Sequence, residues 1–265
     1  RYIRKSSDNT PLLEIRNLAK SGNYENISFS VRKGDIFGVI GLLGSGRTEL
    51  ALSLFGLNPP DSGEIYFDGK QVNISSPIKA RNLGIGLLPE DKYTQGLFLE
   101  RSVKQNISSS IIDRLTNYIN SIDFKAEDKA AEDNVKRLNV RTPSIETIAK
   151  TLSGGNQQKI VIGKWIATNP KLFIMDSPTV GIDIGSKAEI YELIQSFAAK
   201  GMAIIFISDE IEEIMNNCNR VLVMVQGKTV SLIKKDETDS DDLASHIENL
   251  ISSTQNKQYV ITTGG

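Results

Sequence analysis

The sequence predicts an α/β fold in which helices cover both faces of a parallel sheet, and three observations support this prediction. Short apolar runs recur along the chain, and segments with helical periodicity separate them. One apolar run ends in a glycine-rich turn that opens a helix, and a later run ends in a carboxylate. Because such runs are too short for helices, they read as buried strands, and strands that alternate with helices form parallel sheets.

The first part of the chain is rich in predicted strands. Residues 12–18, 27–31 and 65–67 alternate between apolar and polar side chains, with turn residues at Asp61-Ser62-Gly63 and Asp68-Gly69. We therefore expect an antiparallel β portion at the N-terminus. Residues 1–11 are polar up to Pro11 and are predicted to be a linker.

The glycine-rich turn follows the apolar run at 35–40. Its eight residues, GLLGSGRT, match the P-loop template G-x-x-x-x-G-K-[ST] with arginine in the lysine position, and residues 49–55 continue as an amphipathic helix. Such glycines let consecutive backbone amides surround phosphate oxygens, and the threonine offers a hydroxyl to Mg²⁺. A turn without a ligand is the disfavoured alternative. The predicted phosphate-binding residues are Gly41, Leu42, Leu43, Gly44, Ser45, Gly46, Arg47, Thr48 and Glu49.

A helical pattern occupies the middle of the chain. After a further predicted strand at 85–88, residues from about 95 to 160 carry many charged side chains in helical spacing and are predicted to form an inserted helical subdomain. This insert ends at the sequence TLSGGNQQK, residues 151–159. Ser153 is placed to cap a helix whose glycines leave the first turn uncovered, so this helix start is a candidate anion site. Taken alone, it fits an ordinary capped helix equally well.

The apolar run at 171–175 ends in Asp176, and further buried strands are predicted at 203–208 and 221–225. An acid at the tip of a buried strand, in a chain with a P-loop, is placed to hold Mg²⁺ together with Thr48. The alternative is an aspartate that caps the next turn. The order of P-loop, LSGG and strand-terminal aspartate is far more specific than any of the three.

Composition limits the function classes. The chain has 31 basic and 32 acidic residues, which disfavours general nucleic-acid binding. No apolar run approaches the ~18 to 20 residues of a membrane span, and the single cysteine, Cys218, fits a reducing compartment and reads as a core residue. We expect a cytosolic domain whose membrane role is peripheral. Residues 236–265 are acidic and then polar, with a short predicted helix at 241–251.

These motifs in this order resemble the nucleotide-binding domains of ABC transporters, over about residues 12–235. Segments 41–50, 89–108, 152–159 and 178–191 are similar to the branch that imports ribose, galactose and xylose. The resemblance implies a P-loop NTPase (RecA-like) core with a parallel sheet, an N-terminal antiparallel β portion and an inserted helical subdomain. In that branch two such domains are fused, and this sequence is most similar to the second, C-terminal half.

The resemblance also implies cofactors and partners. ATP and Mg²⁺ would lie between the P-loop of one domain and the LSGG helix of the other. The residues offered to the partner's ATP would be Leu152, Ser153, Gly154, Gly155, Asn156 and Gln157. Asp183 matches the family's D-loop, with a helix N-cap before 186–191 as the alternative. The loop at 90–99 would receive a membrane-spanning permease subunit at the cytoplasmic face of the membrane, and a solute-binding protein would take part indirectly.

Three positions outside the P-loop depart from the family pattern. Ser177 stands where a catalytic glutamate is usual, and loss of a general base costs about 10²- to 10⁴-fold in rate, or about 3 to 5 kcal/mol of barrier. Asp209 stands where a histidine is usual, and as an alternative it forms a capping box with Glu212. Glu90 replaces a glutamine and is still able to bind Mg²⁺. The only histidine, His246, lies in the tail, on a helix face predicted to be exposed.

Arg47 keeps the positive charge of the usual lysine but has a planar, bulkier shape. We expect nucleotide binding to survive this change and fast hydrolysis at this P-loop to be lost. Tyr24 is a candidate for stacking on adenine, with a tyrosine in a surface turn as the alternative. The leading prediction is a weak hydrolytic centre that supplies its LSGG motif to the partner's site. A silent pseudo-ATPase and a soluble non-transport ABC protein are the competing classes.

Overall fold

The computed structural model describes residues 2, 4, 9–116, 121–234 and 244–253. Its larger sheet has the strand order β10-β9-β3-β8-β7-β6. The strands are β3 (Ile36–Ile40), β6 (Ile85–Leu88), β7 (Leu172–Asp176), β8 (Ala203–Ser208), β9 (Arg220–Val225) and β10 (Lys228–Lys234). Neighbouring strands from β9 to β6 are parallel, and β10 pairs antiparallel with β9. The predicted parallel sheet is confirmed, with one antiparallel edge strand added.

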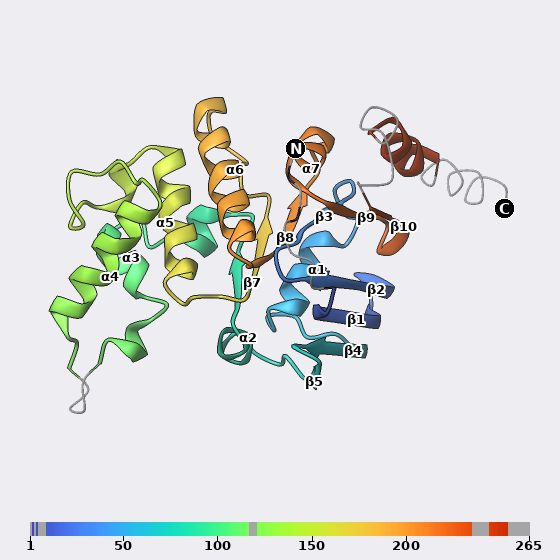
Figure 1. The fold of residues 1–265 in the computed structure, drawn as a ribbon, viewed down its shortest axis with the longest axis horizontal. Coiled ribbons are helices and arrows are strands. Elements are labelled where there is room, and N and C mark those ends of the chain that lie inside the picture. The colour runs from blue at the N-terminus through green and yellow to red at the C-terminus, as the bar shows by residue number, and fades with distance from the viewer. Residues whose placement is uncertain (1, 3, 5–8, 117–120, 235–243, 254–265) are drawn as a thin grey trace.

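A smaller antiparallel sheet lies beside it, in the order β2-β1-β4-β5 (Figure 1). Its strands are β1 (Pro11–Lys20), β2 (Tyr24–Arg32), β4 (Ser62–Phe67) and β5 (Lys70–Val72). This confirms the predicted antiparallel β portion. Within residues 1–11, predicted as a linker, Tyr2 is buried and its hydroxyl donates to the Gly34 carbonyl at 2.8 Å.

The helices divide between the central sheet and one end of the molecule. They are α1 (Arg47–Leu54), α2 (Pro77–Leu83), α3 (Val103–Ser108), α4 (Phe124–Arg137), α5 (Gly154–Ile166), α6 (Ile184–Ala199) and α7 (Ile211–Asn217). Shorter helical turns are η1 (Lys92–Gly96), η2 (Ile112–Arg114) and η3 (Ala149–Thr151). Figure 1 shows α3, α4 and α5 together at one end, where the helical insert was predicted.

The large sheet is buried on both faces because its strand side chains alternate in direction. Ile36, Phe206 and their neighbours on one face pack with α5, α6 and α7. Phe37, Ile205 and their neighbours on the other face pack with α1 and the small sheet, and the Phe37 ring stacks on Phe29 at 4.9 Å between centroids. Two apolar cores on either side of one sheet follow from this alternation.

The C-terminal part of the described chain is a helix at 244–253. Ile247 and Ile251 are buried in the core, while His246 is exposed as predicted. The predicted helix at 241–251 is therefore confirmed from residue 244 onward, and the predicted polar tail lies outside the described residues. Across the described residues, no helix combines the length and the apolar character that spanning a bilayer demands.

Candidate functional site

The turn between β3 and α1 is built around glycines. Gly44 and Gly46 have φ values of 77° and 88°, a left-handed conformation that glycine adopts without strain. A side chain on Gly41 would overlap with the Met224 carbonyl oxygen. Gly46 is the N-cap of α1 and no side chain caps the helix, so no capping side chain competes with a ligand for the first-turn N–H groups. The side chains of the turn that are exposed or half-buried are Leu42, Leu43, Arg47, Thr48 and Glu49.

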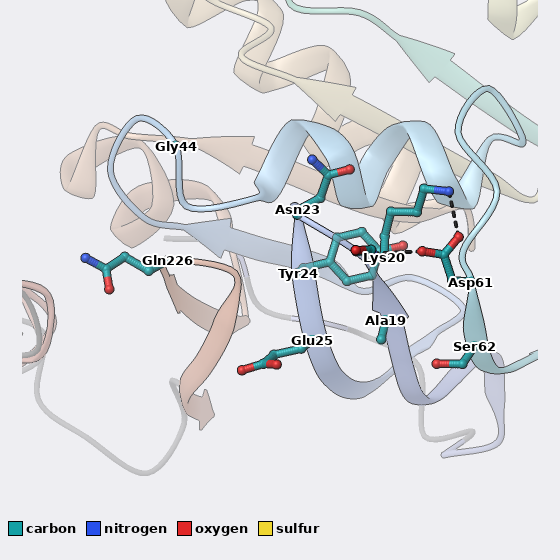
Figure 2. A pocket seen from close by; sticks show the side chains of 11 residues that line it. Ala19, Lys20, Asn23, Tyr24, Glu25, Gly44, Asp61, Ser62 and Gln226 are labelled. Atoms are coloured by element: carbon teal, nitrogen blue, oxygen red, sulfur yellow. Dashed lines mark hydrogen bonds and ion pairs between the residues drawn. The ribbon is translucent and has the colours of Figure 1, made fainter.

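The hairpin between β9 and β10 holds this turn from the side. The Gly227 N–H donates to the Ser45 carbonyl at 3.0 Å, and the Gly227 carbonyl accepts from the Glu25 N–H at 2.8 Å. Gln226 has a φ of 49° and lines the same hollow as Gly44 (Figure 2). Sequence reasoning missed this support, although a Gln-Gly pair directly after an apolar run is a weak turn signal.

Arg47 and Ser45 each have a buried polar atom at this turn. One terminal nitrogen of Arg47, Nη1, and the Ser45 hydroxyl have no hydrogen-bond partner among the described residues. Burial lowers the pKa of Arg47, while the charges of Asp209, Asp176 and Glu90 oppose that shift. Because a buried donor without a partner is costly, these atoms indicate that an anionic ligand completes the site.

Asp176 lies at the tip of β7, with 3% of its surface exposed. Burial raises its pKa to about 6, Glu90 adds to the rise, and a hydrogen bond from Thr48 and the charge of Arg47 oppose it. The structure therefore brings together the two predicted Mg²⁺ ligands, Thr48 and Asp176. Within the described ranges no three metal-binding side chains cluster. A pair of protein ligands completed by phosphate oxygens and water is the arrangement that Mg²⁺ usually takes.

Ser177 follows Asp176 directly. Its φ is 49°, its N–H donates to the Ile207 carbonyl at 3.0 Å, and its hydroxyl donates to Asp176 Oδ1 at 3.4 Å. This long hydrogen bond directs the Ser177 hydroxyl to Asp176, the carboxylate predicted to hold Mg²⁺. This geometry supports the expectation that Ser177 cannot replace a glutamate.

Asp209 and Glu90 are exposed at the ends of β8 and β6. The capping box predicted for Asp209 is wrong, because the N-cap of α7 is Glu210, without a side-chain cap. The Glu210 N–H instead donates to the Ser208 hydroxyl at 3.1 Å. With no capping role, Asp209 remains as a negative charge that acts on Arg47.

The LSGG stretch forms the start of α5, as predicted. Ser153 is the N-cap, and its hydroxyl accepts from the Asn156 N–H at 3.5 Å and from the Asn156 side chain at 2.9 Å. Leu152 and Gly154 are half-buried. The prediction that Gln157 faces the partner's ATP is wrong. Gln157 is buried, and its Nε2 donates to the Ala149 carbonyl at 3.2 Å. Its amide therefore points into the protein, away from the surface that Ser153 occupies.

Asp183 lies close to this helix start. It is the exposed N-cap of α6, and its carboxylate accepts from the Ser186 N–H at 2.9 Å, which confirms the alternative capping role. A side chain on Gly155 would overlap with the Ser186 side chain, and one on Gly154 would lie 3.3 Å from the Gly181 carbonyl. The absence of side chains therefore lets α5 and α6 approach closely. The LSGG and Asp183 segments thus share one surface, which the sequence did not predict.

An open hollow of about 650 Å³ lies next to Gly44 (Figure 2). Its wall includes the Lys20–Asp61 ion pair, with 2.8 Å between Nζ and Oδ1, and the backbone turn at Asn23. Tyr24 belongs to this wall but only 3% of its surface is exposed. The alternative of a surface tyrosine is therefore wrong, and the Tyr24 ring has no free face on which a base could stack.

Known proteins are similar to this chain in sequence. A protein of Pseudomonas savastanoi pv. phaseolicola, provisionally named a ribose/galactose/methyl galactoside import ATP-binding protein, is 46% identical over 228 residues, covering 85% of this chain and 43% of that protein. The ribose import ATP-binding protein RbsA of Geobacillus kaustophilus is 43% identical over 231 residues, covering 87% and 47%. The chain thus spans about half the length of the curated relatives it matches.

Solved structures and a family comparison also match this chain to ABC transporters. A nucleotide-free ATP-binding cassette from an ABC transporter matches with a TM-score of 0.75 and 25% identity, over 92% of this chain and 96% of that one. An ADP-bound cassette matches with the same TM-score and 23% identity, over 95% and 99%, which supports the fold alone. The sequence model of the ABC transporter family matches residues 24–180, which hold the P-loop, LSGG and Asp176. This chain belongs to the ABC transporter family, and its fold is that of the ABC cassette.

Proposed function

We propose that this chain is the ATP-binding part of a bacterial ABC importer for a sugar or a similar polar solute. The observation that carries the proposal is the buried, unpartnered nitrogen of Arg47 beneath a glycine turn, next to Thr48 and Asp176. A nucleotide phosphate supplies the missing acceptor for that nitrogen. The names of the relatives support a sugar as the solute.

Each part of the turn has a role in holding the nucleotide. The backbone amides of the turn and the Arg47 guanidinium bind phosphate oxygens. Thr48 and Asp176 would hold Mg²⁺, with the exposed Glu90 as a further ligand, directly or through water. When bound, Mg²⁺ neutralises charge on the phosphates. Asp209 adds negative charge to the side where the terminal phosphate would lie, and Ser177 supplies no base, so hydrolysis at this site is weak.

The LSGG surface serves a second nucleotide-binding domain. In this proposal Leu152, Ser153, Gly154, Gly155 and Asn156 close over ATP held by that domain, while Gln157 supports the helix from inside. The start of α5 carries the partial positive charge of a helix N-terminus, which favours an anion there. The second domain belongs to the N-terminal half of the same polypeptide. The complex works at the cytoplasmic face of the membrane with permease subunits and, indirectly, a solute-binding protein, without nucleic acid.

A catalytically silent pseudo-ATPase is the second candidate function. Ser177 and Asp209 favour it for this site, because the Ser177 hydroxyl bonds to the proposed metal ligand Asp176 and Asp209 is an acid whose charge acts on Arg47. The two functions differ in turnover rather than in binding. A soluble ABC protein that does not take part in transport ranks third, and association with a membrane subunit would separate it from the importer.

Calorimetric titration of MgATP into the chain tests the nucleotide site, with Arg47→Ala as the variant. We expect micromolar binding that the variant weakens at least about tenfold, because it removes a charge-assisted hydrogen bond. Arg101→Ala, at an exposed arginine of the helical insert, is the matched control and should bind normally. Equal binding by the Arg47 variant, or no binding by the unmodified chain, would refute the assignment of this turn.

A further inference from the structure

Glu213 is a buried carboxylate that collects hydrogen bonds from several segments. It lies on α7 with 5% of its surface exposed. Three hydroxyl groups donate to its two oxygens: Thr179 at 2.6 Å, Tyr191 at 2.6 Å and Ser208 at 2.7 Å. The Lys187 ammonium donates at 3.2 Å and also pairs with Glu210 at 2.9 Å. These four donors lie on three different segments of the chain, so Glu213 links segments that are far apart in the sequence.

The donors come from segments that flank the two surfaces described above. Thr179 lies two residues after Ser177, in the loop that leads to Asp183. Lys187 and Tyr191 lie on α6, which begins directly after Asp183. Ser208 ends β8 and immediately precedes Asp209, the acid that acts on Arg47. One carboxylate therefore joins the Asp209 side of the nucleotide site to the segment that carries Asp183.

The same loop is fastened from its other side. The ammonium of Lys92, a residue with 5% exposure in η1, donates to the Val180 carbonyl at 3.4 Å. The loop at 177–183 is thus held between η1 and Glu213. Charged groups on other segments thus add to the loop's own backbone hydrogen bonds, such as the one from the Val180 N–H to the Ser177 carbonyl at 3.2 Å.

Glu213 suits this task as an ionised group. Burial acts to raise its pKa, but hydrogen bonds from Thr179, Tyr191, Ser208 and Lys187 outweigh burial, and the pKa is lowered. A buried ionised carboxylate with several donors binds each of them more strongly than a neutral acceptor does. Movement of one donor therefore changes the electrostatic field at Glu213 and the room that the other donors have around its carboxylate.

We infer that Glu213 is a positioning residue that couples nucleotide occupancy near Arg47 and Asp209 to the placement of Asp183. This inference rests on the proposed nucleotide site. A ligand that pairs with Arg47 changes the charge next to Asp209, at the end of β8. Because Ser208 and Thr179 share one carboxylate, a shift at the end of β8 reaches the loop before Asp183. The position of Asp183 on the surface that faces the second domain then depends on whether nucleotide is bound.

Hydrogen exchange of the chain with and without MgATP tests the coupling, with Glu213→Gln as the variant. In the unmodified chain, MgATP should slow exchange in the nucleotide segment 41–48 and, by at least about threefold, in segment 178–187. Glu213→Gln should keep the response at 41–48 and lose that at 178–187, with nucleotide affinity changed less than about threefold. Glu212→Gln, at the adjacent exposed glutamate, is the matched control and should respond like the unmodified chain.

The outcomes separate the inference from the function on which it rests. A full response at 178–187 in Glu213→Gln, or no response there in the unmodified chain, would overturn the coupling alone. No response at 41–48 in the unmodified chain would overturn the nucleotide site and the coupling with it. If Glu213→Gln does not fold, Tyr191→Phe removes one donor and leaves the charge in place. It should reduce the response at 178–187 only, and an unreduced response would count against the inference.

Discussion

Replacement of Asp176 by asparagine should stabilise the empty protein above pH 6. In the folded chain the pKa of this carboxyl is raised from 3.8 to about 6, first by burial. Between these two pH values the unfolded chain has lost the proton and the folded chain still holds it. The free energy of unfolding therefore falls as pH rises through this window, and the loss is complete above pH 6. A difference of about two pH units corresponds to about 3 kcal/mol.

Asparagine does not ionise, so Asp176→Asn should escape this loss. Urea unfolding of both chains at several pH values, without nucleotide or Mg²⁺, measures the difference. We expect the variant's advantage to grow from pH 4 to pH 7 by about 2 to 3 kcal/mol, or about 5 to 10 °C in melting temperature. At neutral pH the variant should also lose Mg²⁺-dependent nucleotide binding, because it lacks the anionic ligand.

The pH dependence is the deciding observation. A stability difference that stays constant from pH 4 to pH 7, or that favours the aspartate more as pH rises, would refute the reasoning. The first result would mean that burial does not hold the proton on Asp176, and the second that its charge is already paired in the folded chain. The matched control is Asp123→Asn, at the exposed N-cap of α4. Its advantage over the unmodified chain should not grow between pH 4 and pH 7.

Three further changes test the close packing and capping in the site. Gly155→Ala should cost about 1 to 3 kcal/mol in urea unfolding, because the new methyl overlaps with Ser186, and Ser186→Gly should restore most of it. Gly41→Ala should cost at least about 2 kcal/mol and abolish calorimetric nucleotide binding, since it meets the backbone at Met224. Ser153→Ala should cost about 1 kcal/mol in thermal unfolding through loss of the α5 cap. A neutral result for any of them would contradict the geometry behind it.

Strands in the middle of the large sheet were the easiest elements to predict. β7 and β8 are fully buried strands, apolar up to a single polar residue at the end of each, so their ends were predicted to within one residue. β10, at the sheet edge, was missed because its residues are all exposed or half-buried, and such a strand lacks an apolar run. β5 was missed for the same reason.

Side-chain direction was harder to predict than the elements. Gln157 was expected on the LSGG surface, but α5 is buried along most of its length and turns that amide inward. Tyr24 was expected to be exposed in either interpretation, yet the packing of the small sheet against the P-loop covers it. Asp209 had a plausible capping pattern, but the helix starts one residue later and leaves its charge free to act on Arg47.

The sequence by itself determined the chemistry: a glycine turn with a cation and a hydroxyl, a capped helix start, and a strand-terminal carboxylate. These depend on neighbouring residues, because turns, caps and strand ends are set by local backbone preference and hydrophobic period. Only the tertiary structure decided which groups share a surface. The approach of α5 to α6 and the four donors around Glu213 join residues 22 to 34 positions apart, or on different elements. Such contacts arise from packing and burial, which no local pattern records.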